Sequence, residues 1–211
     1  GTLTLTDTSV TGNVTTYTGS SSYGHGGGIC DASVSISGGS ISGNEGRNGG
    51  GLYSCSGQVS NCQLIGNMAR YDGGGVWTND SSLTFTGCAI EENDADGFGG
   101  AMYVNGGQPT VQSSQVRLNS ASQCGGIWVE SGTLRTGNTL YCGNGVNISG
   151  DSQDLGGNTF QGGCDGSGAT TRLVPEEYAT IQAAIDACYD GDLVLVGPGV
   201  YSEGLNFGGR E

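Results

Sequence analysis

The sequence predicts an all-β protein, a right-handed parallel β-helix solenoid with one short capping helix near the C-terminus. Three observations predict this fold. Asn residues recur at intervals of 31, 23, 26, 26 and 25 residues, apolar residues recur at fixed distances before them, and Gly runs recur between them. A period of this length is typical of a solenoid, in which each coil buries its apolar face against its neighbours.

The recurring Asn residues mark one corner of each coil. Most follow an apolar residue and a Gly, as in Val10-Thr11-Gly12-Asn13. Asn tolerates the left-handed backbone of a corner, and its amide both donates and accepts hydrogen bonds, so Asn residues stacked in adjacent coils can bond to one another. We therefore expect a structural ladder of Asn13, Asn44, Asn67, Asn93, Asn119 and Asn144.

Three apolar columns accompany these marks. One lies eight residues before the Asn, one lies three residues before it, and one directly follows the Gly run. Alternate residues of a strand share a face, so this spacing predicts three short strands per coil. The Gly runs supply left-handed backbone, and space where a Cβ would crowd the chain, at a second corner. The columns are Leu5, Ile36, Val59, Phe85 and Val111; Val10, Ile41, Leu64, Ile90, Val116 and Tyr141; and Ile29, Leu52, Val76, Ala101 and Ile127.

The Gly-Gly-Gly-apolar-aromatic segments and the apolar-x-Gly-Asn corners resemble those of bacterial right-handed β-helix repeat proteins. That group includes polymorphic outer-membrane and autotransporter passengers and surface proteins of planctomycete type. The resemblance covers residues 3 to about 164. It implies a surface scaffold or adhesin, although pectate lyase-like enzymes share the solenoid and the coil pattern says little about function.

Eight Cys residues with a single His and no Cys-x-x-Cys pair favour disulfides over zinc. Disulfides in turn indicate an extracellular or cell-surface location. The candidate pairs are Cys142 with Cys164, Cys62 with Cys88, and Cys30 with Cys55. The first pair brackets the segment where the repeat fades and would close the solenoid. The second occupies one column in adjacent coils, where a reduced thiol ladder is an equal alternative.

The chain divides into three parts where the repeat fades. These are solenoid coils at 1–164, a linker at 165–173 and a further unit at 174–211. The last part resembles the capping helix and first coil that open pectate lyase-like β-helices. Its expected elements are a helix at 180–187 with Thr180 as N-cap and Gly191 as the end of the run, a strand at 193–196 and a strand at 200–203.

A domain-opening unit at the C-terminus would leave an open strand edge at each end of the chain, and an open edge is a template for another strand. We expect the unit to complete the first coil of a following molecule, which gives head-to-tail self-association. Continuation in a tandem array is one alternative. Closure onto the chain's own first coil is the other, and the short linker makes it strained. The expected interface is Leu3, Leu5, Ile181, Ile185, Leu205 and Phe207.

The net charge is −14, from 20 acidic residues against six Arg and no Lys. Nucleic acids and anionic membranes require cationic footprints, so neither is an expected partner. The densest acidic patch is Glu91, Glu92, Asp94 and Asp96, with Arg117 one coil onward. We interpret it as a solvated corner, with a weak Ca²⁺ site near Glu91, Asp94 and Asp96 as the alternative. No catalytic, cofactor-binding or dedicated metal residues are expected.

An aromatic column follows the Gly runs at Tyr53, Trp77 and Trp128, with Tyr103 close to it. The column faces away from the apolar columns, so we expect either a structural stack or a surface for sugar rings. His25 is expected in a loop. The favoured function is a non-enzymatic structural module of the cell surface or of a fibre. The alternative is a polysaccharide-binding or polysaccharide-cleaving β-helix.

Overall fold

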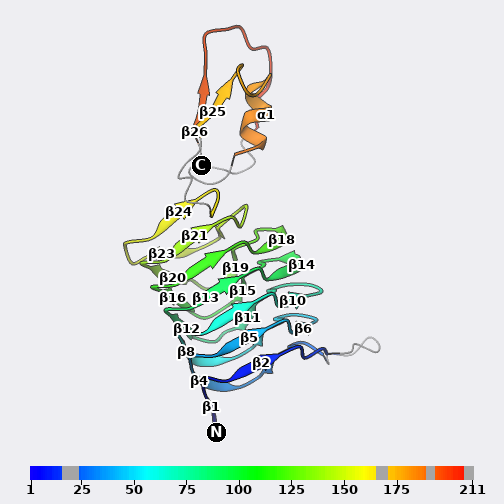
Figure 1. Cartoon of the computed structure of the whole chain (residues 1–211), viewed down its shortest axis with the longest axis vertical. Coiled ribbons are helices and arrows are strands. Elements are labelled where there is room, and N and C mark those ends of the chain that lie inside the picture. Colours follow the sequence, from blue (N-terminus) through cyan, green and yellow to red (C-terminus); the bar gives the residue numbers. More distant parts are fainter. Residues whose placement is uncertain (16–23, 165–170, 189–192, 207–211) are drawn as a thin grey trace.

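The computed structural model of the chain describes residues 1–15, 24–164, 171–188 and 193–206. It is a parallel β-solenoid whose coils stack along the long axis, with a small separate unit beyond the last coil (Figure 1). The fold class is confirmed, since nearly all of the described regular structure is strand and its single helix, α1 (Ile181–Asp186), lies near the C-terminus. No described helix is long and apolar enough to cross a membrane.

Two seven-stranded sheets form two walls of the solenoid. In both, every strand pairs in parallel with its equivalent in the next coil. Sheet A contains β1 (Thr2–Thr6), β4 (Ser33–Ser37), β8 (Ser56–Ser60), β12 (Leu83–Thr86), β16 (Thr110–Gln112), β20 (Leu134–Gly137) and β23 (Ser152–Asp154). Sheet B contains β2 (Ser9–Thr11), β5 (Ser40–Ser42), β9 (Gln63–Ile65), β13 (Ala89–Glu91), β17 (Gln115–Arg117), β21 (Leu140–Cys142) and β24 (Thr159–Gln161).

Two shorter sheets complete the coils. Sheet C contains β6 (Glu45–Gly46), β10 (Met68–Ala69), β14 (Asp94–Phe98) and β18 (Ser120–Gln123). Sheet D contains β3 (Ile29–Cys30), β7 (Leu52–Tyr53), β11 (Val76–Asn79), β15 (Met102–Asn105), β19 (Ile127–Ser131) and β22 (Ile148–Ser149). The prediction of three strands per coil was therefore wrong. The residues that follow Asn44, Asn67, Asn93 and Asn119 are extended, and they pair between coils as a fourth sheet.

The interior is a continuous apolar core built from the predicted columns. Strand alternation sends Val34 and Ile36 of β4 inward and the Ser residues between them outward. One assignment changes, because Met102, and not Ala101, pairs with Val76 in sheet D. Ala101 takes the place of the third Gly of the run and is also fully buried. The largest fully buried side chains, Tyr141 and Phe85, belong to the predicted columns of sheets B and A.

The glycines of the second corner are required for two different steric reasons. The first Gly of a run, such as Gly73, has a φ of 69°, a backbone conformation that residues with a Cβ adopt at a cost. The second, such as Gly74, has ordinary φ, but a Cβ there would overlap the carbonyl oxygens of Asp94 and Gly100. The Gly run therefore lets neighbouring coils approach closely at this corner.

The left-handed residue of the first corner is the one before the Asn, and not the Asn itself. Gly66 has a φ of 62° at this position, whereas Glu92 and Leu118 hold φ values of 55° and 56°. The ladder Asn residues have no positive φ. Asn is thus selected at this corner for its amide and not for its tolerance of the left-handed region.

The exposed Glu92 gives a test of this backbone cost. Glu92→Gly is expected to raise the free energy of unfolding by about 1 kcal/mol, since a left-handed residue with a Cβ costs roughly that much. Gly66→Ala in the same column is expected to lower it by a similar amount, because a Cβ there meets no atom within 4 Å and only the backbone term remains. Urea denaturation measures both variants, and changes of the same sign would contradict the explanation.

The C-terminal unit pairs β25 (Thr171–Val174) with β26 (Leu193–Val196) in parallel, and α1 packs on them. The helix prediction is confirmed, with the Thr180 side chain accepting from Ala183 N at 3.1 Å. Residues 171–173 lie in β25 and not in a linker. The sequence did not indicate this strand, because its partner, β26, is far away along the chain. Residues 200–203 form no strand. Gly191 and residues 165–170 lie outside the described residues.

Candidate functional site

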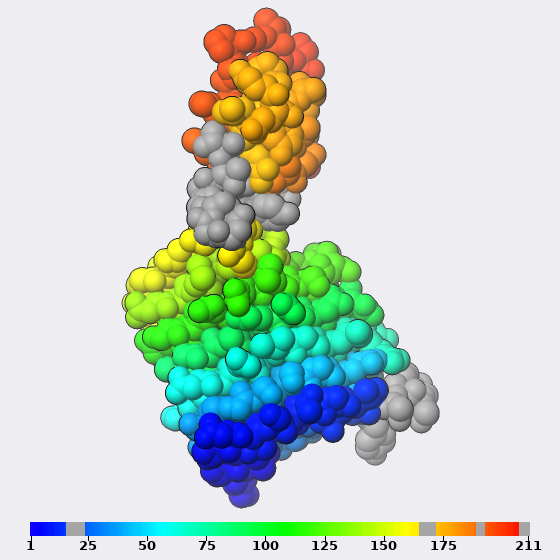
Figure 2. Space-filling model, in the orientation of Figure 1, coloured from blue at the N-terminus to red at the C-terminus, as the bar shows by residue number. Residues whose placement is uncertain are grey.

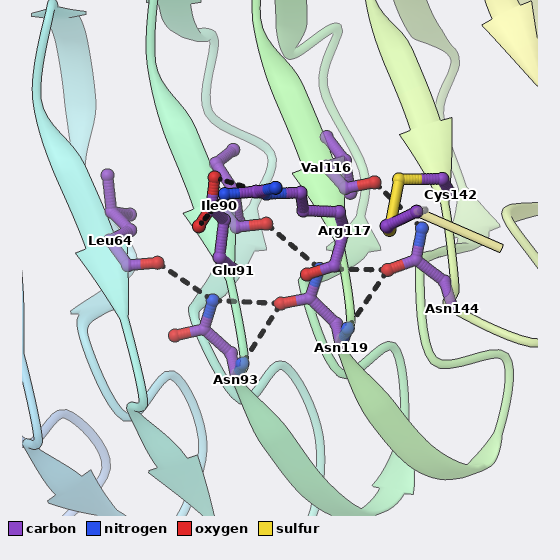
Figure 3. Close-up of polar contacts among 10 residues, drawn as sticks. Leu64, Ile90, Glu91, Asn93, Val116, Arg117, Asn119, Cys142 and Asn144 are labelled. Atoms are coloured by element: carbon purple, nitrogen blue, oxygen red, sulfur yellow. Dashed lines mark hydrogen bonds and ion pairs between the residues drawn. A yellow bond between two sulfur atoms is a disulfide. The ribbon is translucent and has the colours of Figure 1, made fainter. Parts of the chain in front are cut away.

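The predicted ladder is present, and it saturates the hydrogen-bonding capacity of its buried members (Figure 3). Each Nδ2, from Asn13 to Asn119, donates to the Oδ1 of the Asn in the next coil at 2.9–3.0 Å. The same Oδ1 also accepts from the preceding Asn's backbone N–H, as Asn67 Oδ1 does from Asn44 N at 3.1 Å. The second Nδ2 proton goes to a backbone carbonyl of the preceding coil, as from Asn93 to Leu64 O at 2.9 Å.

A seventh residue, Asn147, ends the ladder. Asn144 Nδ2 donates to Asn147 Oδ1 at 2.8 Å within the same coil, and Asn147 is buried. The 25-residue period cannot reveal this residue, because it lies only three positions from the last mark. The ladder therefore links successive coils, and the amides of its members from Asn44 to Asn144 are fully used in hydrogen bonds to the protein.

Glu91 of the acidic patch is paired and not free for a metal. It lies opposite Arg117 in sheet B, and Arg117 Nη2 donates to Glu91 Oε2 at 3.0 Å. Arg117 Nε lies 2.7 Å from Oε1 without the alignment of a hydrogen bond. Glu91 is only 8% exposed. The pair lies beside the ladder (Figure 3), and Arg117 neutralises the one buried carboxylate of the patch.

The other carboxylates of the patch lie on sheet C. Asp94 and Asp96 are exposed on one face of β14, where Ser120 Oγ donates to Asp94 Oδ1. Among the described residues, no group of three His, Cys, Asp or Glu side chains is placed to hold a metal ion. Glu91 thus lies on sheet B, and Asp94 and Asp96 lie on sheet C.

The cysteines divide into one disulfide and a set of thiols. Cys142 of β21 bonds to Cys164 with a Cα–Cα distance of 5.2 Å, so the predicted closure of the solenoid is confirmed. Cys30 and Cys55 are both thiols, and the bridge suggested for them is not formed. Of the two alternatives for Cys62 and Cys88, the structure has the thiols.

Cys62 and Cys88 belong to a column of hydrogen-bonding side chains. The column continues through the hydroxyl residues Ser114 and Thr139 in the following coils. Cys88 N donates to Ser114 Oγ at 3.1 Å, and Ser114 N to Thr139 Oγ1 at 3.4 Å. Cys88 Sγ donates to Val59 O at 3.4 Å, as Thr139 Oγ1 does to Val111 O. Burial raises the pKa of Cys62 to about 11 and also raises the pKa of Cys88. Both thiols are therefore protonated donors at neutral pH.

Cys88 tests whether the column works through hydrogen bonds. Cys88→Ser is expected to change the free energy of unfolding by less than about 1 kcal/mol, because the hydroxyl repeats the role of Ser114. Cys88→Val has a similar volume but no donor or acceptor, and is expected to cost about 1–3 kcal/mol by removing the bonds to Val59 O and to the Cys62 backbone. Equal stability of the two variants in urea would show that the column is only packing.

The aromatic column is longer than predicted and is stacked along the solenoid. Tyr103 belongs to it, between Trp77 and Trp128, and His25 stacks on Tyr53 with ring centroids 4.7 Å apart. Tyr53 and Trp77 stack at 4.7 Å with their planes 14° apart. Trp77 and Tyr103 are parallel at 6.2 Å, and Trp128 is tilted against Phe98 at 4.6 Å. Ring faces from His25 to Trp77 thus cover one another, whereas a sugar ring would need an open face. This geometry favours the structural stack.

The first coil presents open strand edges. β1 and β2 are terminal strands of sheets A and B, so one edge of each has no partner strand among the described residues. Leu3 of β1 is 39% exposed, and Leu5 is half-buried. Both lie at the end of core columns that continue into Val34 and Ile36. The apolar interior is therefore uncovered at this end.

The C-terminal unit carries a second uncovered apolar surface. Leu193 and Leu195 of β26 are 57% and 55% exposed, and a run of four apolar residues such as 193–196 is typical of a strand buried on both faces. Of the predicted interface, Leu205 is exposed and Ile181 half-buried, but Ile185 is already buried inside the unit. Phe207 lies outside the described residues. The interface predicted from the sequence did not include Leu193 and Leu195, although the run of apolar residues at 193–196 could have indicated them.

The two surfaces lie at opposite ends of the molecule (Figure 2). The unit follows the last coil and does not fold back onto β1 (Figure 1). Comparisons of the chain with protein-family models, with curated proteins and with solved structures found no match. The fold therefore rests on the structure itself, and the resemblance to pectate lyase-like surface proteins stays a hypothesis.

Proposed function

We propose that the protein is a non-enzymatic structural module of the extracellular space or cell surface, which assembles head to tail. The observation that carries this proposal is a pair of strands with exposed Leu side chains, β1 at one end and β26 in the unit at the other. Parallel pairing of β26 with β1 of a second copy would extend sheet A across the junction and cover Leu3, Leu193 and Leu195. Because the two surfaces differ, such a contact leads to an open fibre and not a closed dimer.

The charge distribution supports this orientation. Neither β1 nor β26 contains a charged residue, although the chain carries a net charge of −14. The two strands themselves can therefore pair without a like-charge contact between them. The extracellular assignment is supported by the Cys142–Cys164 disulfide.

The assembly test uses the full chain and a change in its exposed apolar strand. Leu195→Asp is expected to abolish assembly by placing a charge in the contact, at little cost to folding because the side chain is already half exposed. Val200→Asp is the matched control, since Val200 is 95% exposed in the same unit but outside the strand. Light scattering over a wide concentration range and electron microscopy provide the readout. A wild-type chain that stays monomeric throughout would exclude head-to-tail assembly.

The non-enzymatic part of the proposal has its own test. The protein is incubated with polygalacturonate and alginate, and unsaturated products are followed by their ultraviolet absorbance. No product is expected, since the one buried carboxylate of the acidic patch, Glu91, is held by Arg117. Steady product formation would establish the polysaccharide-cleaving alternative and leave the assembly result unaffected.

A further inference from the structure

The outward face of sheet A carries an ordered array of hydroxyl groups. On its first four strands, β1, β4, β8 and β12, the outward residues are Ser or Thr at every position except Gln58. We call this surface the hydroxyl face, and its members are Thr2, Thr4, Thr6, Ser33, Ser35, Ser37, Ser56, Ser60, Thr84 and Thr86. The strands of sheet A follow one another along one side of the molecule (Figure 1).

Strand pairing places these hydroxyls in rows. Thr6 pairs with Ser37, Ser37 with Ser60, and Ser60 with Thr86, so one row contains a hydroxyl in four successive coils. The rows repeat about every 4.8 Å across the strands and about every 6.6–6.8 Å along them, which are the spacings of a parallel sheet. The pairing of each strand on both sides from β4 to β12 fixes the array, so its hydroxyls lose little freedom on binding.

The hydroxyl face also differs from the rest of the surface in charge. None of its residues is ionisable, although the chain has a net charge of −14. Among the described residues, the first charged outward residue on sheet A is Arg135 of β20, beyond the face. No hydrogen bond within the described protein engages a hydroxyl of β1 or β4, whereas Ser60 Oγ donates to Ile36 O at 3.1 Å. The array is therefore neutral and open to an external partner.

The partner that fits is a crystalline lattice of water. Hexagonal ice repeats its oxygen positions at distances comparable to both spacings of the array, and each surface oxygen can donate and accept, as a Ser or Thr hydroxyl does. A charged face would instead hold its own hydration shell. A sugar-binding face would be expected to offer open aromatic rings, and the aromatic column of this protein lies on sheet D. We propose that the hydroxyl face binds the surface of ice crystals, independently of head-to-tail assembly.

The test is the incorporation of the full-length protein into slowly growing ice. The wild-type chain is expected to enter the ice and to slow ice recrystallisation, whereas serum albumin is excluded. Ser35→Lys, in the middle of the face, is expected to lose both effects, because a long charged side chain holds the lattice away from the neighbouring hydroxyls. Gln115→Lys is the matched control, since Gln115 is exposed on a strand of sheet B and is expected to retain both. Circular dichroism confirms that each variant is folded.

Two results would overturn the proposal. One is exclusion of the folded wild-type chain from ice, which would make the face an ordinary solvated surface. The other is equal behaviour of Ser35→Lys and Gln115→Lys, which would place any ice contact elsewhere. Binding to crystalline cellulose or chitin that Ser35→Lys abolishes, without incorporation into ice, would assign the face to a polysaccharide crystal and also reject ice as its partner.

Discussion

Replacing Asn67 with Ala is expected to lower the free energy of unfolding by about 3 kcal/mol or more. The Asn67 amide donates to Ile41 O and Asn93 Oδ1, both at 2.9 Å, and accepts from the backbone and side chain of Asn44. All of these partners are buried in the solenoid wall. Each bond contributes about 1 kcal/mol, and buried groups left without a partner add a desolvation penalty.

Asn13→Ala is the matched control for this change. Asn13 lies at the exposed end of the same ladder, donates to Asn44 Oδ1 and is bonded to no preceding coil among the described residues. Its loss is expected to cost less than about 1 kcal/mol, because solvent can replace the bonds. Urea denaturation followed by circular dichroism measures both variants. A loss at Asn67 no larger than the loss at Asn13 would show that the ladder does not hold the coils together.

Removing the Cys142–Cys164 disulfide is the second change with a large expected effect. The bond closes a loop with a sequence separation of 22 residues, for which the loss of chain entropy in the unfolded state predicts about 3 kcal/mol of stabilisation. The loop contains the whole last coil, including β23, whose residues are all exposed. Among the described strands, those of this coil pair on one side only, so the coil depends on the covalent link more than an inner coil would.

The double variant Cys142→Ser/Cys164→Ser is therefore expected to open the last coil before the rest of the solenoid. Hydrogen exchange should speed up in β24 and β23, while the amides of β9 and β13 stay protected. Cys30→Ser is the control, because the Cys30 thiol is exposed and bonded to no other cysteine. Unchanged exchange in β24 after loss of the disulfide would show that strand pairing with β21 alone secures the coil.

The sequence alone determined the solenoid, the Asn ladder and the register of sheets A and B, and that of sheet D except at Ala101. It could do so because these features depend on which residue types recur at a coil's length. The apolar residues before Asn67 and Asn93, and the Gly runs after them, occupy equivalent places in every coil. The closing disulfide was also readable, since Cys142 and Cys164 flank the point where the repeat ends.

The three-dimensional packing decided what the period does not encode. Whether Cys62 and Cys88 are thiols depends on the hydrogen bonds that their column makes with backbone groups and with Ser114. The pairing of Glu91 with Arg117 removed the buried carboxylate from the acidic patch. Tyr53 stacks on Trp77 and covers its ring face. The sequence shows only that the two residues share a column, and does not show whether their rings are stacked.

The strand pairing of the C-terminal unit could not be predicted from the sequence, and the reason is physical. Residues 171–173 read as a linker because they carry no repeat, and they form a strand only because β26, 22 residues onward, provides a parallel partner. A strand without such a partner leaves its backbone groups unpaired, so its existence is a property of the fold and not of the segment. In sheets A and B the strands recur from coil to coil, and there the repeat was sufficient to predict them. In the C-terminal unit the partner strand occurs once, and only the tertiary structure could supply it.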